Sequence, residues 1–249
     1  MVKRLGRMLR DAPEIPQFLR DYAELKRQQK QSFVAFPFGE MYPCLDDRGS
    51  SAGSAKGHYF HQDLLVARRI FANAPKKHVD VGSRVDGFVA HVAAFRDIEV
   101  LDVRPLTSNI PNVCFRQVDL MAPLSPELVG YCDSLSCLHA LEHFGLGRYG
   151  DTVDFEGHLK GLSNLKRLVA GGGKFYLSVP IGPQRIEFNA HRVFSVETLL
   201  SLVPEFRVDA FSYVNDLGDL HESAALVQDA VADNFGCRYG CGILELTKN

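Results

Sequence analysis

The sequence has no hydrophobic run near the roughly 20 residues that a membrane-spanning helix needs, because charges and prolines interrupt every apolar stretch. Its six cysteines include no CxxC pair, which favours free thiols in a reducing compartment. The basic first residues lack the apolar core of a signal peptide. Neither charge dominates, since 28 Lys and Arg oppose 30 Asp and Glu, which argues against nucleic acid as a partner. We expect a cytoplasmic protein without an integral membrane segment.

The composition is that of an ordinary globular protein, with 46% hydrophobic and 23% charged residues among 249. This length predicts one large domain with an extension. Residues 1–30 carry eight Lys and Arg against four Asp and Glu, with apolar side chains at helical spacing, which predicts two short helices broken near Pro13 and Pro16. We assign residues 1–76 to a helical extension and candidate lid, whose amphipathic face docks on its own domain or, alternatively, contacts anionic lipid.

From Lys77 onward, strand and helix patterns alternate. Short apolar runs predict strands at 78–82, 98–103, 113–119, 131–141 and 174–180. Helices are predicted at 88–95, at 158–173, where glycines end the helix, and at 195–203, where Ser195 is a suitable N-cap. The segments 206–214 and 240–248 alternate like strands, which predicts an antiparallel pair at the sheet edge. We therefore assign residues 77–249 to one α/β domain with a Rossmann-like, mostly parallel sheet.

Polar residues follow the predicted strands, at the place where an open parallel sheet binds its ligand. The first strand leads into Asp80-Val81-Gly82-Ser83-Arg84, where the glycine lets a ligand approach the backbone and the next helix offers free N–H groups. Asp102 ends the second strand, placed to accept both hydroxyl protons of a ribose. Asp119 ends the third, placed to accept a hydrogen bond from an adenine amino group. The fourth strand runs into Leu138-His139-Ala140-Leu141-Glu142-His143.

These features resemble the class I S-adenosylmethionine-dependent methyltransferases, over about residues 77–249. The resemblance implies a sheet of seven strands with an antiparallel last strand, and S-adenosyl-L-methionine as cofactor. The segments GSRVDGF and FNAHR are similar to those of a little-characterised methyltransferase-like family found near bacterial surface-polysaccharide genes, which implies O-methylation of a sugar or sugar nucleotide. The cofactor would then contact Asp80, Gly82, Ser83, Arg84, Asp102, Val103, Asp119, Leu120 and His139.

The glycine turn departs from the usual family pattern, because Arg84 and Asp86 stand where two further glycines are expected. Arg84 would either block the methionine end of the cofactor or pair with its carboxylate, since a guanidinium binds a carboxylate with two hydrogen bonds. Blocking would favour the alternative function, a methyltransferase fold that has lost catalysis and serves as a binding or scaffold protein. The turn also lacks the Lys-Ser/Thr of a P-loop and the GxGxxG of a dinucleotide site.

Histidines supply the candidate bases, since an acceptor hydroxyl has to lose a proton during methyl transfer. His143, beside Glu142, and His191 are predicted to rim one pocket as the catalytic groups. The residues predicted to hold a small-molecule acceptor are His61, Asn189 and Arg192. A homodimer is a further candidate assembly.

Two other groups have metal-ligand chemistry. The close spacing of His58, His61 and Asp63 would suit a metal site completed by His143 or His191, although lining the pocket entrance is the favoured role. Cys237 and Cys241 are expected to be buried thiols. Because methyl transfer requires no metal, we expect none.

Overall fold

The computed structural model describes residues 12–34 and 36–249, so the first part of the predicted extension lies outside the described residues. The chain divides into two compact units, residues 1–54 and 55–249. In the first unit, a 3₁₀ turn at Ala12–Glu14 leads into helix α2 (Ile15–Gln29), the second of the two predicted helices. Arg48, from the following loop, pairs with Asp21 of α2. A role of this unit as a lid stays a prediction.

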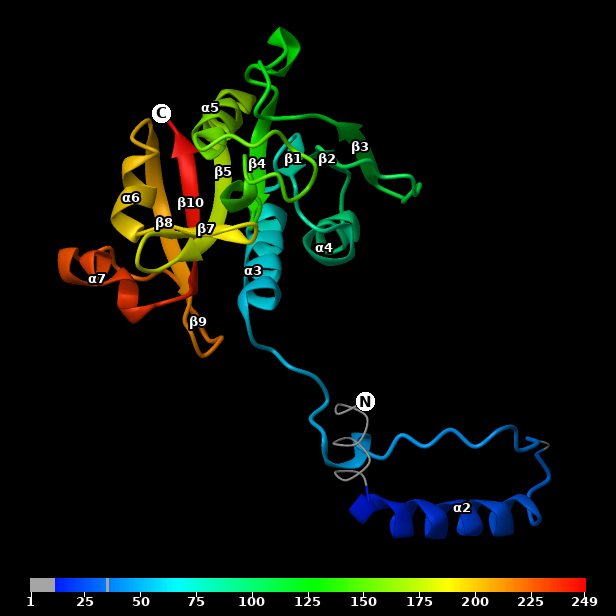
Figure 1. The fold of residues 1–249 in the computed structure, drawn as a ribbon. Coiled ribbons are helices and arrows are strands. Elements are labelled where there is room, and N and C mark those ends of the chain that lie inside the picture. Colours follow the sequence, from blue (N-terminus) through cyan, green and yellow to red (C-terminus); the bar gives the residue numbers. More distant parts are fainter. Residues whose placement is uncertain (1–11, 35) are drawn as a thin grey trace. The chain divides into compact units, whose positions relative to one another are not determined.

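The second unit is built on one eight-stranded sheet (Figure 1). Across the sheet, the strands are β3 (Val113–Gln117), β2 (Ile98–Asp102), β1 (His78–Val81), β4 (Cys132–Leu138), β5 (Val169–Ile181), β10 (Gly240–Lys248), β8 (Phe206–Val214) and β9 (Leu220–His221). The first five are parallel, and β10 is antiparallel to both of its neighbours. A separate hairpin pairs β6 (Arg185–Glu187) with β7 (His191–Val193).

Helices cover both faces of the sheet. The α-helices of this unit are α3 (His58–Asn73), α4 (Ala90–Ala93), α5 (Gly157–Leu168), α6 (Val196–Ser201) and α7 (Gln228–Ala232). A π-type turn occupies Val85–Val89, and 3₁₀ turns occupy Pro126–Leu128, Leu141–His143 and Asn234–Gly236, while the 3₁₀ turn Asp47–Gly49 belongs to the first unit. No helix among residues 12–34 and 36–249 is both long and apolar enough to cross a bilayer.

The core divides into two apolar clusters because successive strand side chains point to opposite faces. Ile243 belongs to the cluster beneath α3 and α4, whereas its neighbour Leu244 belongs to the cluster beneath α5 and α6. Each cluster buries side chains from its helices completely, such as Ile70 of α3 and Leu165 of α5. The sheet is therefore the middle of three layers.

The predicted Rossmann-like, mostly parallel sheet is confirmed. The sheet has one strand more than the seven predicted, because the insertion after β8 adds the two-residue strand β9 at the edge. The pair formed by β8 and β10 is antiparallel as predicted, but β10 lies inside the sheet, between β5 and β8.

Two predicted helices are shorter than their patterns indicated. Of the helix expected at 88–95, Phe88 and Val89 fall in the π-type turn Val85–Val89 and only Ala90–Ala93 form α4. Gly87, just before the predicted helix, takes a non-helical conformation, with φ −124° and ψ −113°. The helix expected at 158–173 ends at Leu168, since Val169 already pairs with Cys132 in the sheet. The link from β2 to β3 is a loop, which leaves room beside the ends of these strands.

Candidate active site

The strand order reverses between β1 and β4, and this is where an open sheet of this kind binds its ligand. Gly82 follows β1 with φ +74°, a conformation that favours glycine. A Cβ atom at Gly82 would lie 2.8 Å from the Cβ of Ala140, which follows β4. The first turn therefore needs glycine both for its backbone angle and for its close approach to the neighbouring strand end.

Asp80 shapes this turn from inside the sheet. Its carboxylate accepts hydrogen bonds from the Ser83 backbone N–H (3.1 Å), from Ser83 Oγ (2.8 Å) and from Ser136 Oγ (2.6 Å). Burial raises the pKa of Asp80 to about 7, although these hydrogen bonds act in the opposite direction. The carboxylate thus faces the serines and not the cavity described next, so the structure gives Asp80 a positioning role.

A cavity of about 870 Å³ opens at the ends of β1 to β4, which is a common size for a small-molecule site. All of the predicted cofactor residues except Asp80 line it. They are Gly82, Ser83, Arg84, Asp102, Val103, Asp119, Leu120 and His139. The topology therefore brings together residues from four separate strand ends, as the sequence predicted for a cofactor site.

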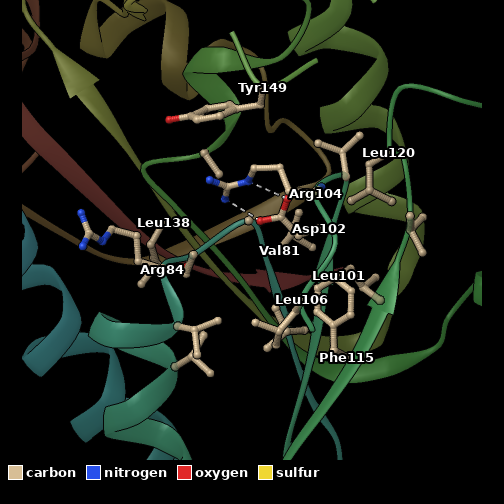
Figure 2. Close-up of a pocket in the computed structure, with 18 of the residues that line it drawn as sticks. Val81, Arg84, Leu101, Asp102, Arg104, Leu106, Phe115, Leu120, Leu138 and Tyr149 are labelled. Carbon is tan, nitrogen blue, oxygen red and sulfur yellow. Dashed lines mark hydrogen bonds and ion pairs between the residues drawn. The ribbon is translucent and has the colours of Figure 1, made fainter. Parts of the chain in front are cut away.

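Asp102 reaches the cavity with its carboxylate already paired. Arg104 donates to it through Nη2 (2.6 Å to Oδ2), Nε (3.0 Å to Oδ1) and the backbone N–H (2.8 Å to Oδ1). The Arg104 guanidinium also lies 4.5 Å from the centre of the Tyr149 ring, at cation–π distance. Figure 2 shows Arg104 turned onto Asp102, with the Tyr149 ring beyond it.

Arg84 does not fill the cavity. Its guanidinium pairs with Asp86 through Nε to Oδ1 (2.9 Å) and Nη2 to Oδ2 (2.6 Å), and both side chains are about two-thirds exposed, at 67% and 71%. In Figure 2, Arg84 points away from the pair formed by Asp102 and Arg104. The Arg84 guanidinium, at the position of a glycine in the family pattern, is thus directed to Asp86.

Asp119 lies at the adenine end of the predicted site and also organises its own loop. Its Oδ1 accepts a hydrogen bond from the backbone N–H of Met121 at 2.8 Å. Leu120 and Met121 line the cavity beside it. A carboxylate oxygen remains for an amino group, which is the role predicted for this residue.

The segment after β4 places two histidines in the cavity wall and a carboxylate behind them. His139 and His143 line the cavity, whereas Glu142 is buried and accepts a hydrogen bond from His139 Nδ1 at 2.7 Å. Burial alone would raise the pKa of the Glu142 carboxyl, but the charge and hydrogen bond of His139 hold that pKa below its usual value. Glu142, predicted to be a catalytic group, therefore holds His139 and does not line the cavity.

One tautomer of His143 is fixed by its contacts, and its Nε2 lies 3.7 Å from Glu142 Oε1. Its Nδ1 lies 2.7 Å from the carbonyl oxygen of Ala190 and must donate to it, which leaves a lone pair on Nε2. Burial lowers the pKa of His143 below its ordinary value, against the opposing effect of Glu142. The imidazole is therefore neutral near pH 7 and able to take a proton.

The second predicted base, His191, and the predicted acceptor residues do not line the cavity, although the His191 ring centre lies 6.5 Å from that of His143. His191, in β7, places Nε2 3.2 Å from a carboxylate oxygen of Glu187. Arg192 donates to backbone carbonyls, among them that of Phe144 at 2.6 Å. Asn189 occupies the exposed turn of the β6–β7 hairpin, with φ +62°, and His61 lies on α3, its ring against Phe60. Their contact with a substrate stays a prediction.

Several cavity residues were not predicted from the sequence, and they come mainly from two loops. They include Arg104, Leu106 and Ser108 after β2, and Arg148, Tyr149 and Asp151 after β4. Arg104 could have been predicted from the sequence, since it lies two positions beyond Asp102, the predicted ribose carboxylate. Tyr149 carried no comparable signal, because its position depends on how its glycine-rich loop folds back.

Solved structures with similar folds include methyltransferases. The 1,6-didemethyltoxoflavin-N1-methyltransferase of Burkholderia thailandensis, solved with S-adenosylhomocysteine, aligns with a TM-score of 0.51 at 14% identity, over 76% of this chain and 78% of that one. The YcgJ protein of Bacillus subtilis gives a TM-score of 0.50 at 12% identity, over 76% of this chain and 98% of the other. The [4+2]-cyclase SpnF gives 0.54 at 16% identity, over 76% and 80%. At these sequence identities the comparisons establish the fold alone. The cyclase shows that proteins of this fold can carry out a reaction other than methyl transfer.

Sequence comparison adds little about activity. The profile of a family described as Caenorhabditis protein of unknown function, DUF268, matches residues 118–227, which is less than half of the chain. No curated protein matches the sequence. The expected association with surface-polysaccharide genes has no support from these comparisons.

Proposed function

We propose that this chain is an S-adenosylmethionine-dependent methyltransferase acting on a hydroxyl group. The observation that carries the proposal is one cavity at the switch point of a methyltransferase fold, lined by Gly82, Asp102 and Asp119. A glycine turn and two carboxylates at successive strand ends are the groups that an adenosyl cofactor needs. S-adenosylmethionine, when bound, supplies an electrophilic methyl group.

The residues present fit this cofactor with one adjustment. Asp102 has the acceptor capacity for a ribose diol, Asp119 for the adenine amino group, and the Gly82 turn has no side chain to obstruct the backbone. The adjustment concerns Arg104, which occupies both oxygens of the Asp102 carboxylate. Binding of a ribose requires these hydrogen bonds to open or to be shared.

His143 is the proposed base. It is a cavity residue with a neutral imidazole whose lone pair is on Nε2, 3.7 Å from Glu142 Oε1, and in this proposal it accepts the acceptor proton as the methyl group is transferred. We further propose that the acceptor is a sugar or sugar nucleotide. That assignment rests on the GSRVDGF and FNAHR resemblance, and the polar side chains of Ser108, Arg148 and Tyr149 in the cavity wall are compatible with a carbohydrate.

The first test is calorimetric titration with S-adenosylmethionine and S-adenosylhomocysteine, on the wild type and on the Arg84→Gly variant. We expect binding by both proteins in about the micromolar range, with less than about a threefold difference, since Arg84 pairs with the exposed Asp86. Binding gained only in Arg84→Gly would mean that Arg84 closes the site. Absence of binding in both would support the alternative of a binding or scaffold protein.

The second test separates the two predicted bases. With an acceptor found by screening sugar nucleotides for S-adenosylhomocysteine release, His143→Gln is expected to lower kcat about a hundredfold or more and to leave cofactor affinity nearly unchanged. His191→Gln is the matched control, because the His191 ring lies 6.5 Å from that of His143 but does not line the cavity. A larger loss in His191→Gln than in His143→Gln would reverse the assignment.

A further inference from the structure

Three side chains with metal-ligand atoms converge beside the cavity. His58 begins α3, His139 follows β4, and Cys241 lies in β10. One ligand atom from each lies within 4.8 Å of the other two. Throughout residues 12–34 and 36–249, no other group of three His, Cys, Asp or Glu side chains meets this spacing. Of the candidate metal ligands that the sequence indicated at the start of α3 (His58, His61 and Asp63), only His58 belongs to this cluster.

His139 is oriented as a metal ligand would be. Its Nδ1 donates to Glu142 Oε1 at 2.7 Å, which fixes the ring and leaves Nε2 as the free nitrogen. That Nε2 atom is buried without a well-formed hydrogen bond, and the Cys241 thiol is its polar neighbour. A histidine that binds a metal through one nitrogen commonly donates through the other to a carboxylate, which orients the ring. An unpaired buried polar atom also costs about 1–3 kcal/mol, so a native fold rarely keeps one without a partner.

The backbone holds His139 firmly in this place. Its φ is +50°, which is unusual for a residue other than glycine. Its N–H donates to the backbone oxygen of Ser178 in β5 at 3.0 Å. The imidazole is therefore positioned from both ends, by β5 through the backbone and by Glu142 through the ring.

Cys241 offers a thiol with weak competing contacts. The residue is fully buried, and its Sγ lies 3.7 Å from Gln62 Oε1 and 3.9 Å from the Gly242 oxygen. Gln62 is held in turn by Ser178, whose hydroxyl donates to its Oε1 at 2.6 Å. The Cys241 Sγ atom therefore has a fixed position on β10. A metal cation bound there would be held by the thiolate that forms when the thiol loses its proton.

We propose that His58, His139 and Cys241 bind a transition-metal dication, with Zn²⁺ as the natural occupant. Two imidazoles and one thiolate form a borderline-soft donor set that suits zinc better than calcium or magnesium. Three protein ligands leave the fourth tetrahedral position for water or a substrate atom. Because His139 also lines the cavity, the ion would adjoin the proposed acceptor site.

Metal binding requires one local movement. Zn–N bonds of about 2.0 Å and a Zn–S bond of about 2.3 Å bring ligand atoms to roughly 3.3–3.7 Å from one another. The His58 and His139 rings are now stacked, with centroids 5.1 Å apart and planes at 12°. His58 is the less buried of the two histidines, so rotation of its side chain is the movement that closes the site.

The test is metal analysis of the full chain freed from any histidine tag. After purification without chelator, we expect close to one equivalent of zinc by mass spectrometry. Cobalt replacement should give a thiolate-to-cobalt charge-transfer band and the strong visible bands of tetrahedral coordination. Cys241→Ser should remove the charge-transfer band and weaken Zn²⁺ binding by at least about a hundredfold, while Glu142→Gln should weaken it about 10–100-fold through loss of ring orientation.

Cys237→Ser is the matched control, since Cys237 is a buried thiol outside the cluster, with Sγ near the Phe235 oxygen. It should keep the stoichiometry and the cobalt spectrum. Circular dichroism establishes that each variant is folded. The cobalt spectrum of the wild type and its thermal stabilisation by Zn²⁺ test the proposal even if a variant fails to fold. A wild type without zinc, cobalt band or stabilisation would overturn the proposal. Cofactor titration is a separate measurement, so failure here leaves the proposed methyltransferase function untouched.

Discussion

Replacing Asp102 with alanine is expected to weaken S-adenosylhomocysteine binding by at least about a hundredfold. The carboxylate lies at the end of β2 in the cavity wall, with only 11% of its side chain exposed. Two hydrogen bonds from ribose hydroxyls to such an ionised acceptor contribute about 1.5–3 kcal/mol each, and each 1.4 kcal/mol changes affinity about tenfold. Calorimetric titration of wild type and variant measures the difference directly.

The Arg104→Ala variant is the control for this experiment. It keeps the Asp102 carboxylate and removes the guanidinium that occupies both of its oxygens, through bonds of 2.6 and 3.0 Å. We therefore expect Arg104→Ala to bind S-adenosylhomocysteine as tightly as the wild type or more tightly. Equal losses in the two variants would show that the ion pair, and not a ribose contact, matters for binding.

The sequence predicted the strand ends well because their chemistry is local. Gly82, Asp102 and Asp119 each follow a short apolar run, and parallel strands must place such residues along one edge. The parallel register then brings them to one cavity without further information. Helix ends were less predictable, since a π-type turn takes the first two residues of the apolar pattern at 88–95, and Val169 pairs with Cys132 in the sheet.

The residues predicted to bind the acceptor were less predictable, because the partners of their side chains depend on tertiary contacts between distant segments. Arg192 has the charge to hold a substrate, but its guanidinium is satisfied by backbone carbonyls of two loops, including those of Phe144 and Phe155. The convergence of His58, His139 and Cys241 has the same origin. These residues are far apart in the sequence and belong to different elements, so no spacing rule could have joined them.

A buried polar network between β1 and β4 gives the second large prediction, which concerns stability and pH. His78 Nε2 lies 3.1 Å from Ser136 Oγ, and that hydroxyl donates to Asp80 at 2.6 Å. His78 Nδ1 lies 2.8 Å from Ser134 Oγ. Burial lowers the pKa of His78 to about 3 and raises that of Asp80 to about 7, so both groups are kept uncharged near pH 5.

The two groups act on stability in opposite directions. The unfolded chain has ordinary pKa values of about 6.5 for histidine and about 3.9 for aspartate. Between about pH 4 and 6.5, unfolding therefore adds a proton to His78 and releases one from Asp80. The His78 contribution to the free energy of unfolding is present above about pH 6.5 and is lost as the pH falls. The Asp80 contribution is present below about pH 4 and is lost as the pH rises to about 7, so the two slopes cancel.

Single substitutions should reveal how each group changes the free energy of unfolding with pH. From urea unfolding between pH 4 and 6.5, the stability advantage of the wild type over His78→Gln is expected to grow by about 1.4 kcal/mol per pH unit, or about 3 kcal/mol in all. Its advantage over Asp80→Asn should shrink at a similar rate, because that variant retains His78 alone. Stability differences that stay constant with pH in both variants would mean that neither group is held uncharged. Opposite slopes would identify the network as a neutral polar core beneath the Gly82 turn.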